Sequence, residues 1–345
     1  MKTPSDSARF FALVILVAVL IFASSCVDSV EPAGTAQYSN PEYPSLLKGY
    51  AVITAKFSGV FALDGRVYVL DGEAEIIESF SLSDPRLNMN PSPVEKDTLP
   101  LGFDPGNYAL DRVSEVLYLE DAHGKDIYRI QLPDGTPELL YQNESFISEL
   151  FLTDGNSNLV ICFLGPEWLA RKIDVLTGST LGEFETGWPI TRAAMSFDSG
   201  KLLLSNSSKQ FLLEVDVATM QLADTLYLEE RPGPFTFNTS GNIVLFNQYS
   251  IKPVVYLYDG NSGELLHELP ATNPYQICDV IPGTDVIIAP RRSETRVSIL
   301  NSDNMIFAPS IYCMQYADLA FSTEDGQTII VLTDNPGRVY IYSHQ

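Results

Sequence analysis

The sequence has few basic residues, few histidines and cysteines, and a single long apolar run. Among 345 residues, 21 Lys and Arg stand against 44 Asp and Glu, which gives a formal net charge of -23. A nucleic-acid partner is therefore excluded, because a phosphate backbone is bound by a basic surface. One apolar run cannot supply the several spans, of about 20 residues each, of a polytopic membrane protein. An apolar fraction of 45% and a mean hydropathy of +0.05 exclude a disordered chain and allow a sizeable core.

The amino terminus has the pattern of an export signal. Lys2 and Arg9 form a short positive segment, residues 10–22 are all apolar, and Cys26 follows three small residues. This pattern is typical of a secretory signal. The Cys directly after small residues resembles the lipobox of bacterial lipoproteins, in which the Cys becomes the acylated first residue. Ala23 replaces the usual Leu of that motif, so an ordinary signal peptide and an uncleaved anchor remain the alternatives.

The export signal predicts the domain organisation and the location. We expect a signal peptide over 1–25, a lipidated flexible tether over 26–45 and a folded domain over 46–345. The tether is rich in Pro, Gly and Ser and has no apolar periodicity. The predicted location is the bacterial cell envelope, outside the cytoplasm, with the lipid as the sole anchor to the inner or outer membrane.

Three cysteines remain after the signal, and they do not form a disulfide framework. Cys162 lies within an apolar run and is predicted to be a buried thiol. In an exported protein, a disulfide between Cys278 and Cys313 stays an open alternative.

A repeat of about 42 residues runs through the folded domain. Turns that contain glycine are each followed by an apolar run, and the earlier part of the chain continues this series. The runs start at residues 67, 116, 159, 202, 243, 286 and 329. A second series of alternating strands has the same period and is centred on Ile130, Ile173, Val215, Leu257, Ile299 and Ile341. One further strand precedes each turn glycine, and another follows each strand of the second series. Each repeat therefore holds four short strands.

Four antiparallel strands per repeat are the signature of a β-propeller blade. Seven repeats predict an all-β, seven-bladed β-propeller. The last repeat ends at Gln345 after three strands, so residues 50–56 are predicted to close the ring as its fourth strand. Residues 84–100 lengthen the first repeat and are expected to form a surface loop with an irregular strand. A β-sandwich, or a ring of six or eight blades, is the alternative.

The repeat also carries a family resemblance. The Asp-Gly and Ser-Gly turns, the segments VYLYDGNSGEL and KIDVLTGSTL, and the lipobox resemble bacterial propellers of the YVTN or quinoprotein-like type. The resemblance covers residues 46–345 and implies the fold. It selects no function, because such propellers host binding, lyase, lactonase and dehydrogenase activities. Trp-Asp repeat endings do not occur, so a WD40 scaffold is not expected.

Residues suited to catalysis or to metal binding are scarce. Of the three histidines, His123 is expected in an exposed loop, His267 in an outer strand and His344 at the chain end. No cluster of His, Cys and carboxylates has metal-ligand spacing, and neither a P-loop nor a nucleophile elbow occurs. The turn over 259–264 lacks the distal Glu of a calcium loop. We therefore predict no catalytic residue, no metal and no cofactor.

Basic residues gather on one predicted face. In a propeller the loops between second and third strands, and those between blades, emerge together on what we call the top face. The predicted partner-binding residues there are Lys209, Lys252, Arg291, Arg292, Arg338, Arg192, Trp168 and Tyr275. Arg192 and Tyr275 are also expected beside the central channel, with Asp279 and Asp318 deeper as hydrogen-bonded residues. Chance sorting of surface charge is the alternative.

These observations favour a non-catalytic binding or scaffold module. We expect a monomer that recognises a protein or glycan of the envelope through its top face. The alternative is an enzyme of the lyase or lactonase kind at the mouth of the channel.

Overall fold

The computed structural model describes the folded ring. The described residues are 46–52, 57–88, 94–247, 253–271, 279–281, 283–290, 294–313, 316–323, 325–334 and 337–343. Cys26 and the tether lie outside them, so the signal and the anchor stay predictions. Within these residues, no helix is long and apolar enough to cross a membrane.

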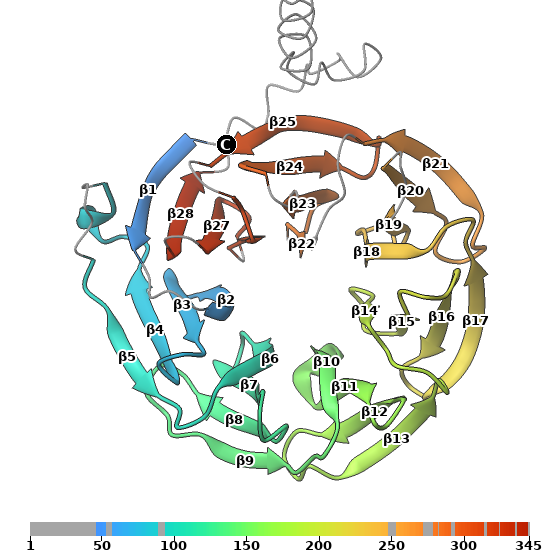
Figure 1. The fold of residues 1–345 in the computed structure, drawn as a ribbon, viewed down its shortest axis with the longest axis horizontal. Coiled ribbons are helices and arrows are strands. Elements are labelled where there is room, and N and C mark those ends of the chain that lie inside the picture. The colour runs from blue at the N-terminus through green and yellow to red at the C-terminus, as the bar shows by residue number, and fades with distance from the viewer. Residues whose placement is uncertain are drawn as a thin grey trace, which may run out of the picture. The chain divides into compact units, whose positions relative to one another are not determined.

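Seven four-stranded antiparallel sheets form the described ring, as Figure 1 shows. The innermost strands are β2 (Phe57–Leu63), β6 (Pro105–Asp111), β10 (Phe146–Leu152), β14 (Arg192–Met195), β18 (Pro232–Phe237), β22 (Asp279–Val280) and β26 (Leu319–Ser322). The second strands are β3 (Arg66–Asp71), β7 (Val116–Asp121), β11 (Asn158–Gly165), β15 (Lys201–Ser205), β19 (Ile243–Asn247), β23 (Val286–Pro290) and β27 (Thr328–Asp334). We number the blades 1 to 7 in this order.

The outer half of each blade completes the sheet. The third strands are β4 (Ile76–Ser81), β8 (Ile127–Gln131), β12 (Leu169–Asp174), β16 (Phe211–Asp216), β20 (Val254–Tyr258), β24 (Arg296–Asn301) and β28 (Gly337–Ser343). The outermost strands are β5 (Asp97–Pro100), β9 (Glu138–Tyr141), β13 (Thr180–Glu185), β17 (Gln221–Tyr227), β21 (Leu265–Pro270), β25 (Ile306–Tyr312) and β1 (Leu46–Val52).

Both predicted strand series are confirmed. Each of the seven apolar runs starts within a second strand, and each centre of the alternating series lies within a third strand. The long first repeat contains the short 3-10 helix η1 (Pro85–Asn88) and then β5 as its fourth strand. The predicted loop with an irregular strand over 84–100 is thereby confirmed for the described part of that segment.

The start of the described chain closes the ring. Strand β1 pairs antiparallel with β28, from Leu46 opposite Ser343 to Val52 opposite Arg338. The predicted closure is confirmed, but the strand is 46–52 and not 50–56. The physical reason is the position of its partner: the described pairing runs along β28 from Ser343 to Arg338, which is one residue from the start of that strand at Gly337. Residues 53–56 lie outside the described residues.

The hydrophobic core lies between neighbouring blades. In β19 and β23 every residue is buried, because each second strand is covered on both faces. One core cluster, for example, joins Val60 and Val69 of blade 1 to Ile330 and Val339 of blade 7. A blade therefore buries its apolar faces only against its neighbours, which couples the stability of all seven.

Two of the remaining cysteines are free thiols in this core. Cys162 of β11 is fully buried, as predicted, and burial raises its pKa well above the usual range. Cys313 is also a free, buried thiol, and the Tyr342 hydroxyl lies 3.6 Å from its Sγ. Cys278, the other cysteine of the disulfide left open above, lies outside the described residues.

Candidate functional site

Half of the eight predicted partner-binding residues lie within the described structure. Lys252, Tyr275, Arg291 and Arg292 lie outside the described residues. Lys209 lies in the loop between β15 and β16 and is partly exposed, and its backbone N–H donates to the Asn206 carbonyl at 2.9 Å. The four described members come from blades 3, 4 and 7, and each has a different setting.

Arg338 is not a loop residue, which corrects the prediction. It is the second residue of β28, where it pairs with Thr333 of β27 and with Val52 of β1, and it is only partly exposed. The reason is that β27 and β28 are joined by just residues 335–336, so the third strand starts earlier than expected. A side chain on a strand inside a sheet is less accessible to a partner than a side chain on a loop.

Trp168 belongs to an exposed apolar patch at the top of blade 3. Phe146, Leu164 and Trp168 expose 52%, 42% and 47% of their surface. Phe146 pairs in register with Gly165, and the indole Nε1 of Trp168 lies 3.5 Å from the position that a Cβ on Gly165 would take. Two aromatic side chains therefore flank the same glycine. We call Phe146, Leu164 and Trp168 the blade 3 patch.

A basic side chain borders this patch. The ammonium of Lys125, from the loop between β7 and β8, lies 4.2 Å from the centroid of the Phe146 ring. It also donates to the backbone carbonyl of Glu144 at 2.7 Å. A cation over an aromatic face is an attractive contact. Lys125 thus holds Phe146 in place at the edge of the patch.

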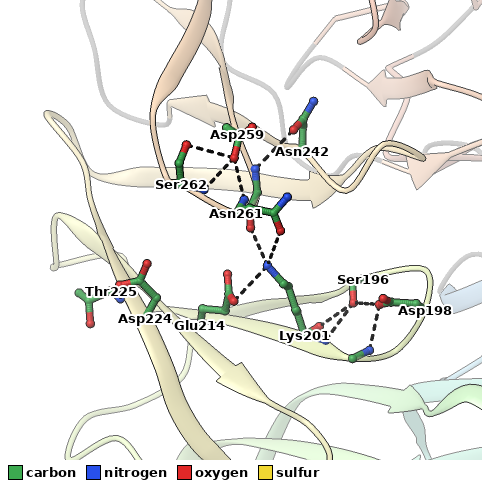
Figure 2. A network of polar contacts seen from close by, with 12 residues as sticks. Ser196, Asp198, Lys201, Glu214, Asp224, Thr225, Asn242, Asp259, Asn261 and Ser262 are labelled. Atoms are coloured by element: carbon green, nitrogen blue, oxygen red, sulfur yellow. Dashed lines mark hydrogen bonds and ion pairs between the residues drawn. The ribbon is translucent and has the colours of Figure 1, made fainter.

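The bottom face is the one opposite the top face, and it carries the turns between first and second strands and between third and fourth strands. Its acidic residues form these turns. Asp259 accepts hydrogen bonds from the backbone N–H groups of Asn261 and Ser262 at 2.9 and 2.7 Å (Figure 2). Lys201 reaches across from blade 4, donating to the Gly260 carbonyl at 2.7 Å and pairing with Glu214 at 3.2 Å. These hydrogen bonds lower the pKa of Asp259. The acidic bottom is therefore accounted for by turn structure and by contacts between blades.

A cavity of about 470 Å³ lies at the centre of the ring. It is lined by innermost strands of blades 1, 2, 3, 6 and 7, and its walls are mainly apolar. Its charged lining residues are Arg112, Glu149 and Asp279. Arg112 donates from Nη1 to the Ala62 carbonyl at 2.6 Å, and the Tyr108 hydroxyl donates to the Val60 carbonyl at 2.5 Å. A cavity of this size, with mainly apolar walls and a few charged groups, can hold a small ligand.

A second cavity of about 240 Å³ adjoins the first at β10. It is lined by β10, β14 and β18, and it shares Glu149 and Phe151 with the larger cavity. Arg192, the first residue of β14, lines this smaller cavity together with Glu149. The prediction that Arg192 lies beside the channel is therefore confirmed. Its role in partner binding on the rim remains a prediction.

The two channel carboxyl groups hold their protons more tightly than usual. Burial raises the pKa of Glu149 to about 7, against the opposing effect of Arg192. Burial also raises the pKa of Asp279 to about 6, although the Val280 N–H donates to its carboxylate at 2.9 Å. Carboxyl groups with a pKa near neutrality inside a cavity are candidates for ligand binding or proton transfer.

Of the other predicted channel residues, Tyr275 lies outside the described residues, and Asp318 does not line either cavity. The backbone N–H of Asp318 donates to the Leu332 carbonyl at 2.9 Å. Glu149 was missed by sequence reasoning. Its signal was a carboxylate at the centre of the otherwise largely apolar strand FISELFL, two residues before Phe151 and therefore on the same face.

The described histidines lie on the surface. Nδ1 of His123 is 3.2 Å from Oδ2 of Asp104, and the side chain is 82% exposed. His267 lies in the exposed outermost strand β21. Among the described residues, no three side chains of His, Cys, Asp or Glu are placed to hold a metal ion.

Comparisons with known proteins identify the architecture alone. No protein-family model matches the sequence, and no curated protein matches it. Among solved structures, the WD40 β-propeller domain of Doa1 is similar, with a TM-score of 0.68 and 14% identity over 88% of this chain and 98% of that one. The chain is a seven-bladed β-propeller.

Hydrazine synthase from Kuenenia stuttgartiensis is similar to this propeller as well. The TM-score is 0.69 at 10% identity, over 84% of this chain and 97% of that one. At such identities the likeness carries the fold and no activity. The chain thus shares the propeller fold of a WD40 domain without the Trp-Asp repeat endings. The fold depends on buried second strands and on turns, and it does not require that dipeptide.

Proposed function

We propose that this propeller is a lipoprotein of the bacterial envelope that binds a partner through its top face and catalyses no reaction. The fold is compatible with a binding or scaffold role. The export signal and Cys26 support the location. The observation that carries the binding role is the blade 3 patch, in which two aromatic side chains and a leucine are exposed together beside a cation.

The chemistry of the patch favours a protein partner over a glycan. Aromatic side chains supply large contact areas at little entropic cost, and Trp is enriched among residues that dominate interface energies. Leu164 adds aliphatic area, which a protein side chain covers better than a polar sugar does. The border formed by Lys125 suits an acidic side chain on the partner's rim.

Replacement of Trp168 by Ala, alone or with Phe146→Ala, is expected to weaken capture of the partner at least about tenfold, as for other exposed aromatic hot spots. The protein would be immobilised, envelope extract passed over it, and the captured partner then purified and its affinity measured for each variant. Because both side chains are about half exposed, the thermal unfolding midpoint should barely change.

Leu176→Ala is the matched control. Leu176 is 77% exposed in the turn between β12 and β13 on the bottom face. If this substitution weakens capture as much as Trp168→Ala does, the top face is not the binding surface. If capture survives protease treatment of the extract but not deglycosylation, the partner is a glycan.

Cys26→Ser is expected to release the protein from membranes or to leave its precursor unprocessed. The reason is that the acyl chains, which would be the sole anchor, are attached to this sulfur. Membrane fractionation and the intact mass of the mature protein are the measurements. An unchanged distribution together with an unchanged mass contradicts lipidation.

A second candidate function rests on the channel carboxyl groups. A general acid or base works best with a pKa near the operating pH, and burial shifts Glu149 and Asp279 in that direction. Under this alternative the propeller would be a lyase or lactonase acting at the channel mouth. Glu149→Gln would then abolish turnover of a lactone or uronide substrate, whereas Trp168→Ala would leave it intact.

A further inference from the structure

The two central cavities are lined by charges of both signs that alternate around the ring. Arg112 comes from blade 2, Glu149 from blade 3, Arg192 from blade 4 and Asp279 from blade 6. We propose that the channel binds a small zwitterion, with the ammonium group of the ligand on Glu149 and its carboxylate on Arg192. This inference is independent of the partner on the top face.

The recognition pair has unused hydrogen-bonding capacity. Glu149 and Arg192 line the same cavity of about 240 Å³. Among the described residues, neither side chain makes a hydrogen bond or an ion pair, and no ion pair joins them directly. Both side chains are partly exposed at the cavity, so their charged groups are accessible to a ligand. A ligand placed between the two would supply donors to Glu149 and acceptors to Arg192.

The other channel groups are less available than this pair. Arg112 is already bonded to the Ala62 carbonyl, and Asp279 accepts the Val280 N–H. Tyr108 donates to Val60. The larger cavity, whose walls include Phe61 and Phe151, offers room for the rest of the ligand along β10.

A zwitterion fits this arrangement better than an ion of one sign. A simple cation would be attracted by Glu149 but repelled by Arg192, and a simple anion the reverse. A ligand with both groups satisfies both side chains and leaves the net charge of the cavity unchanged. Free amino acids, straight-chain ω-amino acids and dipeptides have this chemistry.

The test measures the binding of a series of small molecules to the full mature protein, which includes the folded domain over 46–345. Glycine, 4-aminobutyrate, 6-aminohexanoate and glycylglycine are titrated, with butylamine and butyrate as probes that carry one charge each. At least one zwitterion should bind about ten- to hundredfold more tightly than either single-charge probe, as expected for hydrogen bonds to charged groups. Isothermal titration calorimetry gives the affinities, and the thermal midpoint checks them independently.

Variants assign the contacts. Glu149→Gln and Arg192→Gln should each weaken binding of the best zwitterion about tenfold or more, whereas Arg192→Lys should recover part of it. Glu185→Gln, an exposed carboxylate on the outermost strand of the same blade, is the matched control and should bind normally. Circular dichroism confirms that each variant is folded.

Three results would overturn the proposal. The first is that no member of the series binds, and the second is that butylamine binds as tightly as any zwitterion. The third is that Glu149→Gln leaves the affinity unchanged. Trp168→Ala should leave zwitterion binding intact, so failure of this proposal is distinguishable from failure of the top-face proposal.

Discussion

Deletion of residues 46–52 is expected to abolish the cooperative fold of this propeller. These residues form β1, whose pairing with β28 joins the start of the ring to its end. At about 1 kcal/mol for each lost backbone hydrogen bond, the loss is on the order of 5 kcal/mol, comparable with the total stability of many domains. Thermal unfolding followed by circular dichroism should lose its sharp transition, and light scattering should rise.

The aggregation expected of this variant follows from the exposed edge. Without β1, strand β28 presents a row of unpaired N–H and carbonyl groups, and free strand edges pair readily between molecules. Deletion of residues 27–40, in the predicted tether, is the control and should leave the unfolding midpoint unchanged. Equal midpoints for both deletions and the full mature chain would show that closure by β1 contributes nothing.

The architecture could be predicted because each blade repeats one physical pattern. Second strands are covered on both faces, so runs such as Ile243 to Leu245 appear in the sequence as unbroken apolar segments at a fixed period. The ends of the closing strand could not be predicted in the same way, because the length of its pairing is set by β28, almost 300 residues later. Local alternation gives no information about that register.

The chemistry of the channel could be predicted only in part. Arg192 and Asp279 were placed near the channel because both begin innermost strands. The importance of Glu149 depends on Arg192, which lies in the next blade, and on cavities that form only when several blades are assembled around the channel. Repeat spacing places strands but does not tell which side chains remain without partners once the ring is closed.

Glu149→Gln is expected to stabilise the protein above neutral pH. The pKa of Glu149 is raised to about 7 by burial, from the usual value of 4.5. Because the folded state holds this proton more tightly than the unfolded state, the contribution to stability is complete below about pH 4.5 and is lost as the pH rises through 7. The loss amounts to about 3 kcal/mol by pH 8, at 1.36 kcal/mol for each unit of pKa. Glutamine cannot ionise, so the variant avoids this loss.

The groups around Glu149 set the design of this measurement. The positive charge of Arg192 favours the ionised form of Glu149. Cys162, which pairs with Glu149 between β10 and β11, has a raised pKa. The pKa of Asp279 is lower than that of Glu149, at about 6. Urea unfolding would be measured from pH 5 to 9 for the wild type, Glu149→Gln and the surface control Glu185→Gln. The stability difference between wild type and Glu149→Gln should change mainly between pH 5 and 7 and level off above pH 7. The difference between wild type and Glu185→Gln should stay constant over the same range.

The turn aspartates do not interfere with that window. Hydrogen bonds lower the pKa of Asp174, Asp198, Asp216 and Asp259, so their contribution is present above about pH 4 and is lost only as the pH falls further. A decline in stability between pH 5 and 7 that Glu149→Gln removes therefore reports the channel carboxyl group. If the two stability curves run parallel over this range, Glu149 is ionised at neutral pH without penalty, and the channel is more hydrated than its burial indicates.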